Sequence, residues 1–173
     1  MTISAESHAS STPRTPLAWV AAGFGSGWLP KAPGTWGSLF SLLPAWLLIE
    51  FFGVTALLVA TVVVTWLGCA VCARLLPQMS GDHDPGWIVI DEWAGQWLAM
   101  VLLADWLPDG LWLALVAFVA FRLFDIVKPW PISAIERLGP DWWSIMADDL
   151  AAGLLGALLV MALLVGGGAF FGG

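Results

Sequence analysis

Two pairs of adjacent acidic residues interrupt the apolar parts of this sequence and are the first candidates for chemistry. Asp91 and Glu92 lie near the start of one apolar run, and Asp148 and Asp149 lie near the start of another. A charged side chain inside a membrane helix costs about 2.5–3.5 kcal/mol, so such residues usually mark a function. Mg²⁺ takes oxygen ligands and is often bound through a few carboxylates together with a phosphate. We therefore predict a Mg²⁺ site formed by these four acids and an aspartate from the preceding loop, namely Asp84, Asp91, Glu92, Asp148 and Asp149.

A loop that enters the first apolar run carries a candidate phosphate-binding residue, Lys31. Residues 23–35 contain four Gly and two Pro, a composition that is typical of a loop. Thr35 is expected to cap the helix that follows, next to Gly34. The free N–H groups and the dipole at a helix start favour a bound anion. The alternative is an ordinary helix-entry loop at the membrane surface.

A second set of charged residues, Arg122, Asp125 and Lys128, recurs with a spacing of three near the end of another apolar run. This spacing places the three side chains on one face of a helix. A basic side chain beside a metal is what phosphoryl transfer needs, because that chemistry depends on positioning and charge neutralisation. The alternative is an ordinary salt bridge, with Lys128 reaching out to the membrane surface.

Apolar runs must position these residues. The chain has 173 residues, of which 60% are hydrophobic and 11% charged, and its mean hydropathy is +0.86. A soluble domain is nearer half apolar and a quarter charged, so we predict an integral membrane protein. The first run is short and contains Pro44, which is expected to break it. At about 20 residues per crossing, the pattern predicts an all-α polytopic membrane helix bundle with about five spans, at 36–52, 54–76, 88–107, 111–127 and 145–165.

Five spans place the N-terminus and the loops 77–87 and 128–144 on one side of the membrane. All six Lys and Arg residues fall on this side, which the positive-inside rule makes cytoplasmic. The predicted site therefore lies at the cytoplasmic interface. The domain organisation that we predict is a disordered tail over 1–22, a membrane-embedded domain over 23–165 and a short Gly-rich C-terminus over 166–173.

Other classes of protein fit this pattern less well. A net charge of −7 gives no surface for nucleic acid. A small ion- or proton-coupled transporter would have acids through the depth of the bilayer and broken helices at its midplane, whereas these acids crowd one face. A non-catalytic scaffold would pair its acids with basic residues, but ten acids and six basic residues share the cytoplasmic side. The pattern does not indicate an oligomeric state.

Four motifs in order along the chain resemble those of the phosphatidylglycerophosphatase A family. They are Gly-Ser-Gly-Trp-Leu-Pro-Lys-Ala-Pro-Gly-Thr-Trp-Gly-Ser (25–38), Asp-Pro-Gly-Trp-Ile-Val-Ile-Asp-Glu (84–92), Arg-Leu-Phe-Asp-Ile-Val-Lys-Pro-Trp-Pro (122–131) and Met-Ala-Asp-Asp (146–149). The resemblance covers residues 23–165. It implies a magnesium-dependent enzyme of the bacterial inner membrane that hydrolyses phosphatidylglycerophosphate to phosphatidylglycerol and phosphate.

The residues and the resemblance together suggest separate roles for the residues of the site. Asp125 would orient Arg122, while the carboxylates named above would bind Mg²⁺. Whether water attacks directly or a phospho-aspartyl intermediate forms stays open. The predicted phosphate-binding groups are Lys31, Gly34, Thr35, Arg122 and Lys128, and the predicted catalytic residues are Asp91, Glu92, Lys31, Arg122 and Lys128.

Overall fold

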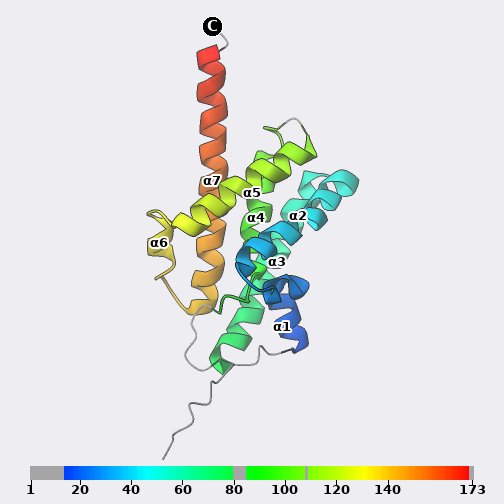
Figure 1. Cartoon of the computed structure of the whole chain (residues 1–173), viewed down its shortest axis with the longest axis vertical. Coiled ribbons are helices and arrows are strands. Elements are labelled where there is room, and N and C mark those ends of the chain that lie inside the picture. Colours follow the sequence, from blue (N-terminus) through cyan, green and yellow to red (C-terminus); the bar gives the residue numbers. More distant parts are fainter. Residues whose placement is uncertain (1–13, 80–84, 108, 172–173) are drawn as a thin grey trace, which may run out of the picture.

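The computed structural model describes residues 14–79, 85–107 and 109–171, and every regular element in these ranges is helical. The predicted all-α class is thereby confirmed. Figure 1 shows the elements along the chain. They are α1 (Pro16–Ala21), the 3₁₀ helix η1 (Gly23–Trp28), α2 (Pro33–Phe52), α3 (Val54–Leu75), the 3₁₀ helix η2 (Leu76–Gln78), α4 (Ile90–Leu103), α5 (Gly110–Val127), α6 (Ile132–Ile135) and α7 (Asp141–Phe171).

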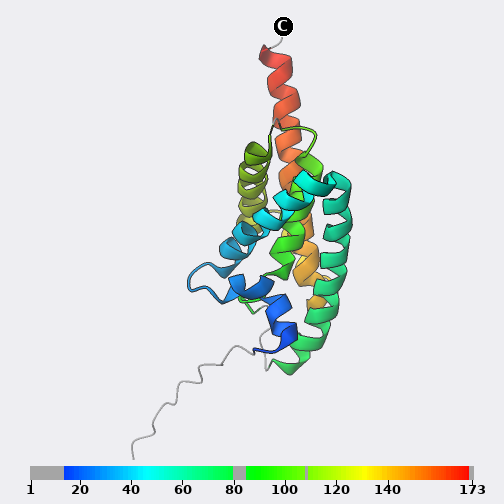
Figure 2. The same ribbon diagram turned by 90° about the vertical axis from the view of Figure 1, so that its right-hand side faces the viewer.

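The short helix α4 forms the centre of the molecule and contacts α2, α3, α5 and α7 (Figures 1 and 2). Most of its 14 residues are buried, including the large side chains of Trp93, Trp97 and Met100. A helix that is apolar on all sides is stable only when other apolar elements surround it. The first turn of α4 carries Asp91 and Glu92, so the fold brings these two acids into its interior.

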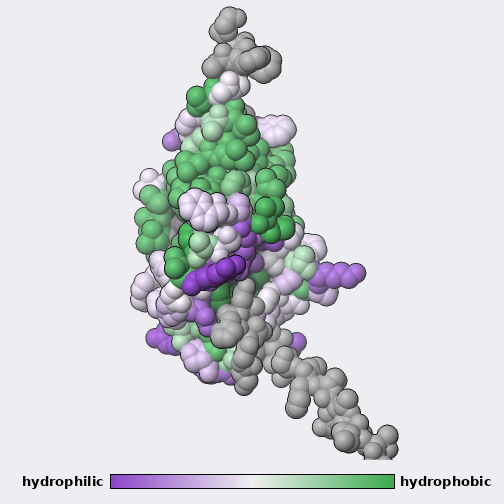
Figure 3. Space-filling model, turned by 90° about the vertical axis from the view of Figure 1, so that its left-hand side faces the viewer, coloured by the Kyte–Doolittle hydropathy of each residue, from purple (hydrophilic) through white to green (hydrophobic). Residues whose placement is uncertain are grey.

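The helices around α4 expose large apolar side chains, as the predicted membrane protein requires. Phe52, Val62, Leu111 and Ile126 are among the exposed residues. On the face shown in Figure 3, hydrophobic residues cover the upper part, and hydrophilic residues gather lower down. Four helical segments of the described chain are long and apolar enough to cross a membrane, namely Pro33–Phe52, Val54–Gln78, Gly110–Val127 and Asp141–Gly167.

The predicted third span, residues 88–107, is not among these four segments. The helix within it, α4, has 14 residues. At about 1.5 Å per residue, it is shorter than the hydrocarbon core of a bilayer, which is about 30 Å thick. The structure thus offers four candidate spans and does not confirm the predicted five. Sequence composition could not distinguish this helix from a span, because a central helix enclosed by protein is as apolar as one facing lipid.

Three other helical segments also differ from the prediction. α2 continues through Pro44 as one helix, because neighbouring helices and local adjustments can compensate for a proline in an apolar bundle. α1 occupies residues 16–21 of the predicted tail, with Ala18 and Ala21 buried. α7 runs on to Phe171 through the predicted Gly-rich C-terminus. α1 therefore occupies part of the segment predicted to be a tail, and residues 1–13 lie outside the described part of the chain.

Glycines let α4 and α7 approach each other closely. A Cβ atom on Gly153 would collide with the carbonyl oxygen of Gly95, and one on Gly95 would lie 2.5 Å from the carbonyl oxygen of Asp149. Small residues at such positions allow helix backbones to come into direct contact in membrane proteins. This contact brings the segment of α7 that carries Asp149 against the first turns of α4.

Candidate metal and phosphate site

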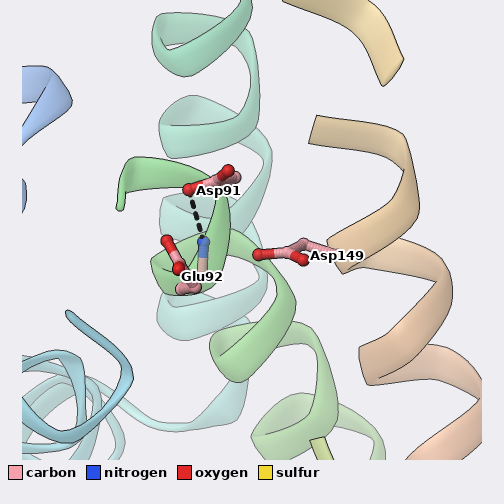
Figure 4. Close-up of side chains that lie close together, drawn as sticks. All are labelled: Asp91, Glu92 and Asp149. Carbon is pink, nitrogen blue, oxygen red and sulfur yellow. Dashed lines mark hydrogen bonds between the residues drawn. The ribbon is translucent and has the colours of Figure 1, made fainter. Parts of the chain in front are cut away.

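Three carboxylates from α4 and α7 form a compact acidic cluster, which consists of Asp91, Glu92 and Asp149. One oxygen of each lies within 4.8 Å of the others. Asp91 and Asp149 are buried and Glu92 is partly buried. Asp149 points from α7 towards the pair on α4, and Asp91 Oδ1 accepts a hydrogen bond of 3.0 Å from the backbone N–H of Glu92 (Figure 4). The predicted meeting of the two acidic pairs is thus observed for three of the four residues.

The acidic cluster fits a hard divalent cation. Glu92 Oε2 and Asp149 Oδ2 are buried and have no hydrogen-bond partner in the part of the chain that the structure describes. Carboxylates in such surroundings must be paired, protonated or bound to a metal, because an isolated buried charge is very costly. Three carboxylates within reach of one another provide the oxygen ligands that Mg²⁺ prefers, and they leave positions for water and phosphate. The cluster could therefore hold a metal ion.

Arg122 of α5 lies beside the acidic cluster and joins α5 to α2. Its Nη1 forms an ion pair of 2.6 Å with Asp125 Oδ2, as their spacing of three predicts. Nη1 also donates to Ser38 Oγ and Nη2 to Thr35 Oγ1, both at 3.4 Å. The buried Nε atom of Arg122 has no hydrogen-bond partner among residues 14–79, 85–107 and 109–171. The guanidinium is therefore held from several sides and keeps a donor to offer.

Gly34 separates the basic and the acidic parts of the site. A Cβ atom on Gly34 would collide with Glu92 Oε1 and would lie 3.3 Å from Arg122 Nη1. A side chain at residue 34 would therefore require Glu92 to move, at a point where Arg122 is also close. Thr35 lies in the first turn of α2, whose N-cap is Ala32, so the predicted capping role of Thr35 is wrong. Its hydroxyl accepts from Arg122 instead.

Lys128 contacts the fourth acid, Asp148, rather than the acidic cluster. It follows the last residue of α5 in a left-handed conformation, and its Nζ donates to Asp148 Oδ2 at 2.7 Å and to Glu136 Oε1 at 2.8 Å. Burial lowers the pKa of Lys128, but the bonds to Asp148 and Glu136 outweigh it and hold that pKa above its ordinary value. Lys128 thus stays protonated at neutral pH and ties α5 to α7.

Two predicted site residues are not placed in the site. Lys31 is exposed in the loop before α2, with a φ of 63°, and it forms no ion pair with a described residue. Asp84 lies outside the described part of the chain. The roles predicted for these two residues stay predictions.

Two buried polar residues near the site were not singled out from the sequence. Ser38 contacts Arg122, and Gln96 lies one turn beyond Glu92 on α4. The only signal for either is a polar residue within an apolar run. Serine is too common in membrane helices for this signal to identify Ser38, whereas a glutamine in such a run is a more informative sign.

Comparisons with known proteins agree with the motifs. Residues 19–164 match the model of a protein family described as Phosphatidylglycerophosphatase A. The chain is 37% identical to Phosphatidylglycerophosphatase A of Haemophilus influenzae over 149 residues, which cover 86% of this chain and 88% of the relative. It is 38% identical to Phosphatidylglycerophosphatase A of Escherichia coli over 138 residues, 80% and 77% of the two chains.

A third relative carries a different name. The chain is 33% identical to a protein of Bacteroides thetaiotaomicron named "Putative phosphatidylinositol-3-phosphatase" over 144 residues, 82% of this chain and 89% of the relative. No solved structure matches the chain. The family match covers most of the chain, including the acidic cluster and Arg122, and confirms the resemblance. This chain belongs to the phosphatidylglycerophosphatase A family.

Proposed function

We propose that this chain is a membrane enzyme that hydrolyses phosphatidylglycerophosphate to phosphatidylglycerol and inorganic phosphate. The observation that carries the proposal is the contact of Gly34 with both Glu92 and Arg122. A cationic side chain with an unpartnered N–H thereby lies directly beside carboxylates with unpartnered oxygens. A phosphate and a divalent cation together would satisfy both sides. The names of two relatives agree with this substrate.

The acidic cluster would hold Mg²⁺ through Asp91, Glu92 and Asp149. When bound, the ion supplies positive charge that polarises the phosphate and stabilises the charge of the transition state. Asp148, fixed by Lys128, would orient the segment of α7 that carries Asp149. Asp84 stays a predicted further ligand from the loop before α4.

The basic side of the site would bind the phosphate oxygens. Arg122 would donate its free N–H, and its ion pair with Asp125 keeps the planar guanidinium in one orientation. A planar, fixed guanidinium can bind two phosphate oxygens at once. Gly34 leaves room for the phosphate to approach, and Thr35 and Lys128 stay the further predicted phosphate-binding residues. Lys31, on an exposed loop, would attract the anionic headgroup from solution.

The enzyme would act in the bacterial inner membrane, with its site facing the cytoplasm. The apolar helices α2, α3, α5 and α7 would lie in the bilayer, and the chain would also cross the membrane between α3 and α5, through the segment that contains the enclosed helix α4 (Figure 1). The one-sided distribution of Lys and Arg supports the orientation. Single cysteines at Gln78 and Gly110, in a variant lacking Cys69 and Cys72, would test it. Only the cysteine at 110 should react with an impermeant thiol reagent added to intact cells, and equal labelling would contradict the topology.

A transporter, the alternative class, is not favoured. A transporter needs ionisable groups distributed along a path through the bilayer. Here the buried acids of the described residues gather at one level, where α4 begins, beside Arg122. The membership of a phosphatase family points the same way.

Phosphate release from detergent micelles that contain phosphatidylglycerophosphate tests the proposed function. The purified protein should release phosphate with Mg²⁺, lose activity in excess chelator and regain it when Mg²⁺ is restored. Ca²⁺ should serve poorly, because it prefers a larger and looser ligand shell. Full activity in excess chelator would contradict the metal site, and no release under any condition would contradict the enzymatic function.

A further inference from the structure

Gln96 is a buried polar residue whose position calls for a ligand. Its side chain is 0% exposed, and neither its Oε1 nor its Nε2 atom has a hydrogen-bond partner among the described residues. Buried amide groups are nearly always hydrogen-bonded, because an unpaired donor or acceptor in an apolar interior is destabilising. An apolar residue of similar size would fill this place at lower cost. A group from outside the described residues, such as part of a bound ligand, would therefore satisfy the amide of Gln96.

Gln96 extends the site deeper into the helix bundle. It lies four residues after Glu92 on α4, and residues with this spacing share a helix face. The separation along the helix axis is about 6 Å, since an α-helix rises about 1.5 Å per residue. The neighbouring Trp97 donates from Nε1 to the carbonyl oxygen of Ser41 on α2 at 2.9 Å. Gln96 is thus at the level where α2 and α4 meet, one turn below the acidic cluster.

α2 provides a matching row of polar residues at this level. Thr35, Ser38 and Ser41 follow one another at a spacing of three, starting at the contact with Arg122. Ser38 and Ser41 are both 0% exposed, and their hydroxyls donate to carbonyl oxygens of α2 itself. Polar groups thus continue from the phosphate side of the site along α2 and α4, into a bundle that is otherwise apolar.

The chemistry of the amide indicates what it binds. A carboxamide presents one acceptor and one N–H₂ donor side by side. A hydroxyl group, which both donates and accepts, can satisfy the two atoms together. An unprotonated phosphate oxygen would satisfy only the donor, and an ammonium group only the acceptor. A hydroxyl is therefore the simplest single ligand group that would satisfy both atoms of the amide.

The proposed substrate has a hydroxyl at the required place. Its terminal phosphate would lie at Arg122 and the acidic cluster, whereas its acyl chains must lie in the apolar part of the membrane. The headgroup glycerol connects the two and carries one free hydroxyl, next to the carbon that bears the terminal phosphate. We propose that Gln96 binds this hydroxyl and so selects lipids whose phosphate is attached to a hydroxylated headgroup. This inference rests on the proposed function.

The test compares two substrates and two enzymes. One substrate is phosphatidylglycerophosphate, and the other is its analogue with 1,3-propanediol in place of the headgroup glycerol, which lacks only the hydroxyl. The parent enzyme should prefer the natural headgroup by about 10- to 100-fold in kcat/KM, the range expected when a buried polar group loses its partner. In the Gln96→Leu variant, kcat/KM for the natural substrate should fall to the value that the parent enzyme has for the analogue. The kcat/KM for the analogue should not change.

Two controls separate selection from a structural role. Gln96→Leu should unfold at the same temperature as the parent enzyme or higher, because it removes an amide without partners. Thr61→Val should leave both substrates unaffected, since Thr61 is a buried polar residue of α3 whose hydroxyl bonds to the carbonyl oxygen of Leu57. An equal effect of Gln96→Leu on both substrates, or no effect, would overturn the inference. A parent enzyme that hydrolyses neither substrate would overturn the proposed function instead.

Discussion

The two acidic pairs look alike in the sequence, but they lie in different surroundings in the fold. On α4, Asp91 and Glu92 both belong to the acidic cluster. On α7, only Asp149 does, and Asp148 bonds to Lys128 instead. Neighbouring side chains on a helix point about 100° apart, so a pair acts together only where both directions face the same site. The first turn of α4 meets this condition, because α2, α5 and α7 surround it.

The comparison assigns different tasks to the two acids of α7. Asp149 has a buried oxygen without a partner among the described residues and lies among carboxylates, so a cation from outside the chain could bind there. Asp148 already has a cation, Lys128, within the chain. We therefore expect Asp149 to bind the metal and Asp148 to hold α7 in place. The predictions below test this difference, from the largest expected effect to the smallest.

Asp149→Asn should abolish metal binding and phosphate release together. An amide keeps the shape of the carboxylate but not the charge that offsets the cation. The loss should exceed the roughly 100-fold that is typical for groups that only orient a metal ligand. Calorimetric titration with Mg²⁺, beside a phosphate-release assay, measures both effects. If the Asp149→Asn and Asp148→Asn variants had the same affinity for Mg²⁺, the two acids would not differ as we infer.

Arg122→Ala should leave metal binding intact and reduce turnover by about 10³-fold, a magnitude known for arginines that stabilise phosphoryl transfer. Arg122→Lys should recover only part of the activity, because an ammonium group cannot bind two oxygens in a fixed plane. Steady-state kinetics and the same titration measure the two quantities. Loss of Mg²⁺ binding in Arg122→Ala would mean that the basic and acidic sides do not act separately.

Gly34→Ala should reduce turnover by about 10²-fold, which is the effect of displacing catalytic groups by about 1 Å. The new methyl group would displace the carboxylate of Glu92 and crowd Arg122. Gly86→Ala is the matched control, since a Cβ atom there meets nothing within 4 Å. The ratio of kcat between the two variants is the readout. Similar values for both would show that residue 34 does not separate the two sides of the site.

The two partners of Lys128 should differ in importance. Asp148→Asn should reduce turnover by about tenfold, because it weakens a buried bond that positions α7. Glu136→Gln should change turnover less than twofold, since this ion pair is largely exposed and such pairs contribute little. Comparing kcat at saturating Mg²⁺ isolates the effect on α7 from that on metal affinity. A larger effect of Glu136→Gln would reverse the assignment.

Local spacing predicted several features correctly. The i,i+3 spacing of Arg122 and Asp125 predicted their ion pair, because helix geometry alone decides whether two such residues meet. The apolar composition predicted the helical membrane bundle. The acids at the start of two apolar runs predicted a shared cluster, since charge inside an apolar bundle requires compensation.

Features that depend on contacts between helices could not be predicted in the same way. Whether α4 faces lipid or protein is decided by its neighbours, and both environments select the same apolar residues. The partner of Lys128 depends on how α5 and α7 are placed. α1 is buried through its contacts with α3 and η1, which its few residues do not reveal. Gln96 was overlooked because its significance lies in the absence of partners around it.

The direct contact of Gly95 with Gly153 has a consequence for how the enzyme responds to its membrane. Lipid bilayers vary in thickness, and spanning helices adapt by tilting. α4 is enclosed by protein, and backbone atoms set its distance from α7. The outer helices can therefore follow a thicker or thinner bilayer while the three carboxylates keep their separation. We expect Mg²⁺ affinity to stay constant across vesicles of different acyl-chain length, because the geometry of the three carboxylates does not depend on the thickness of the bilayer.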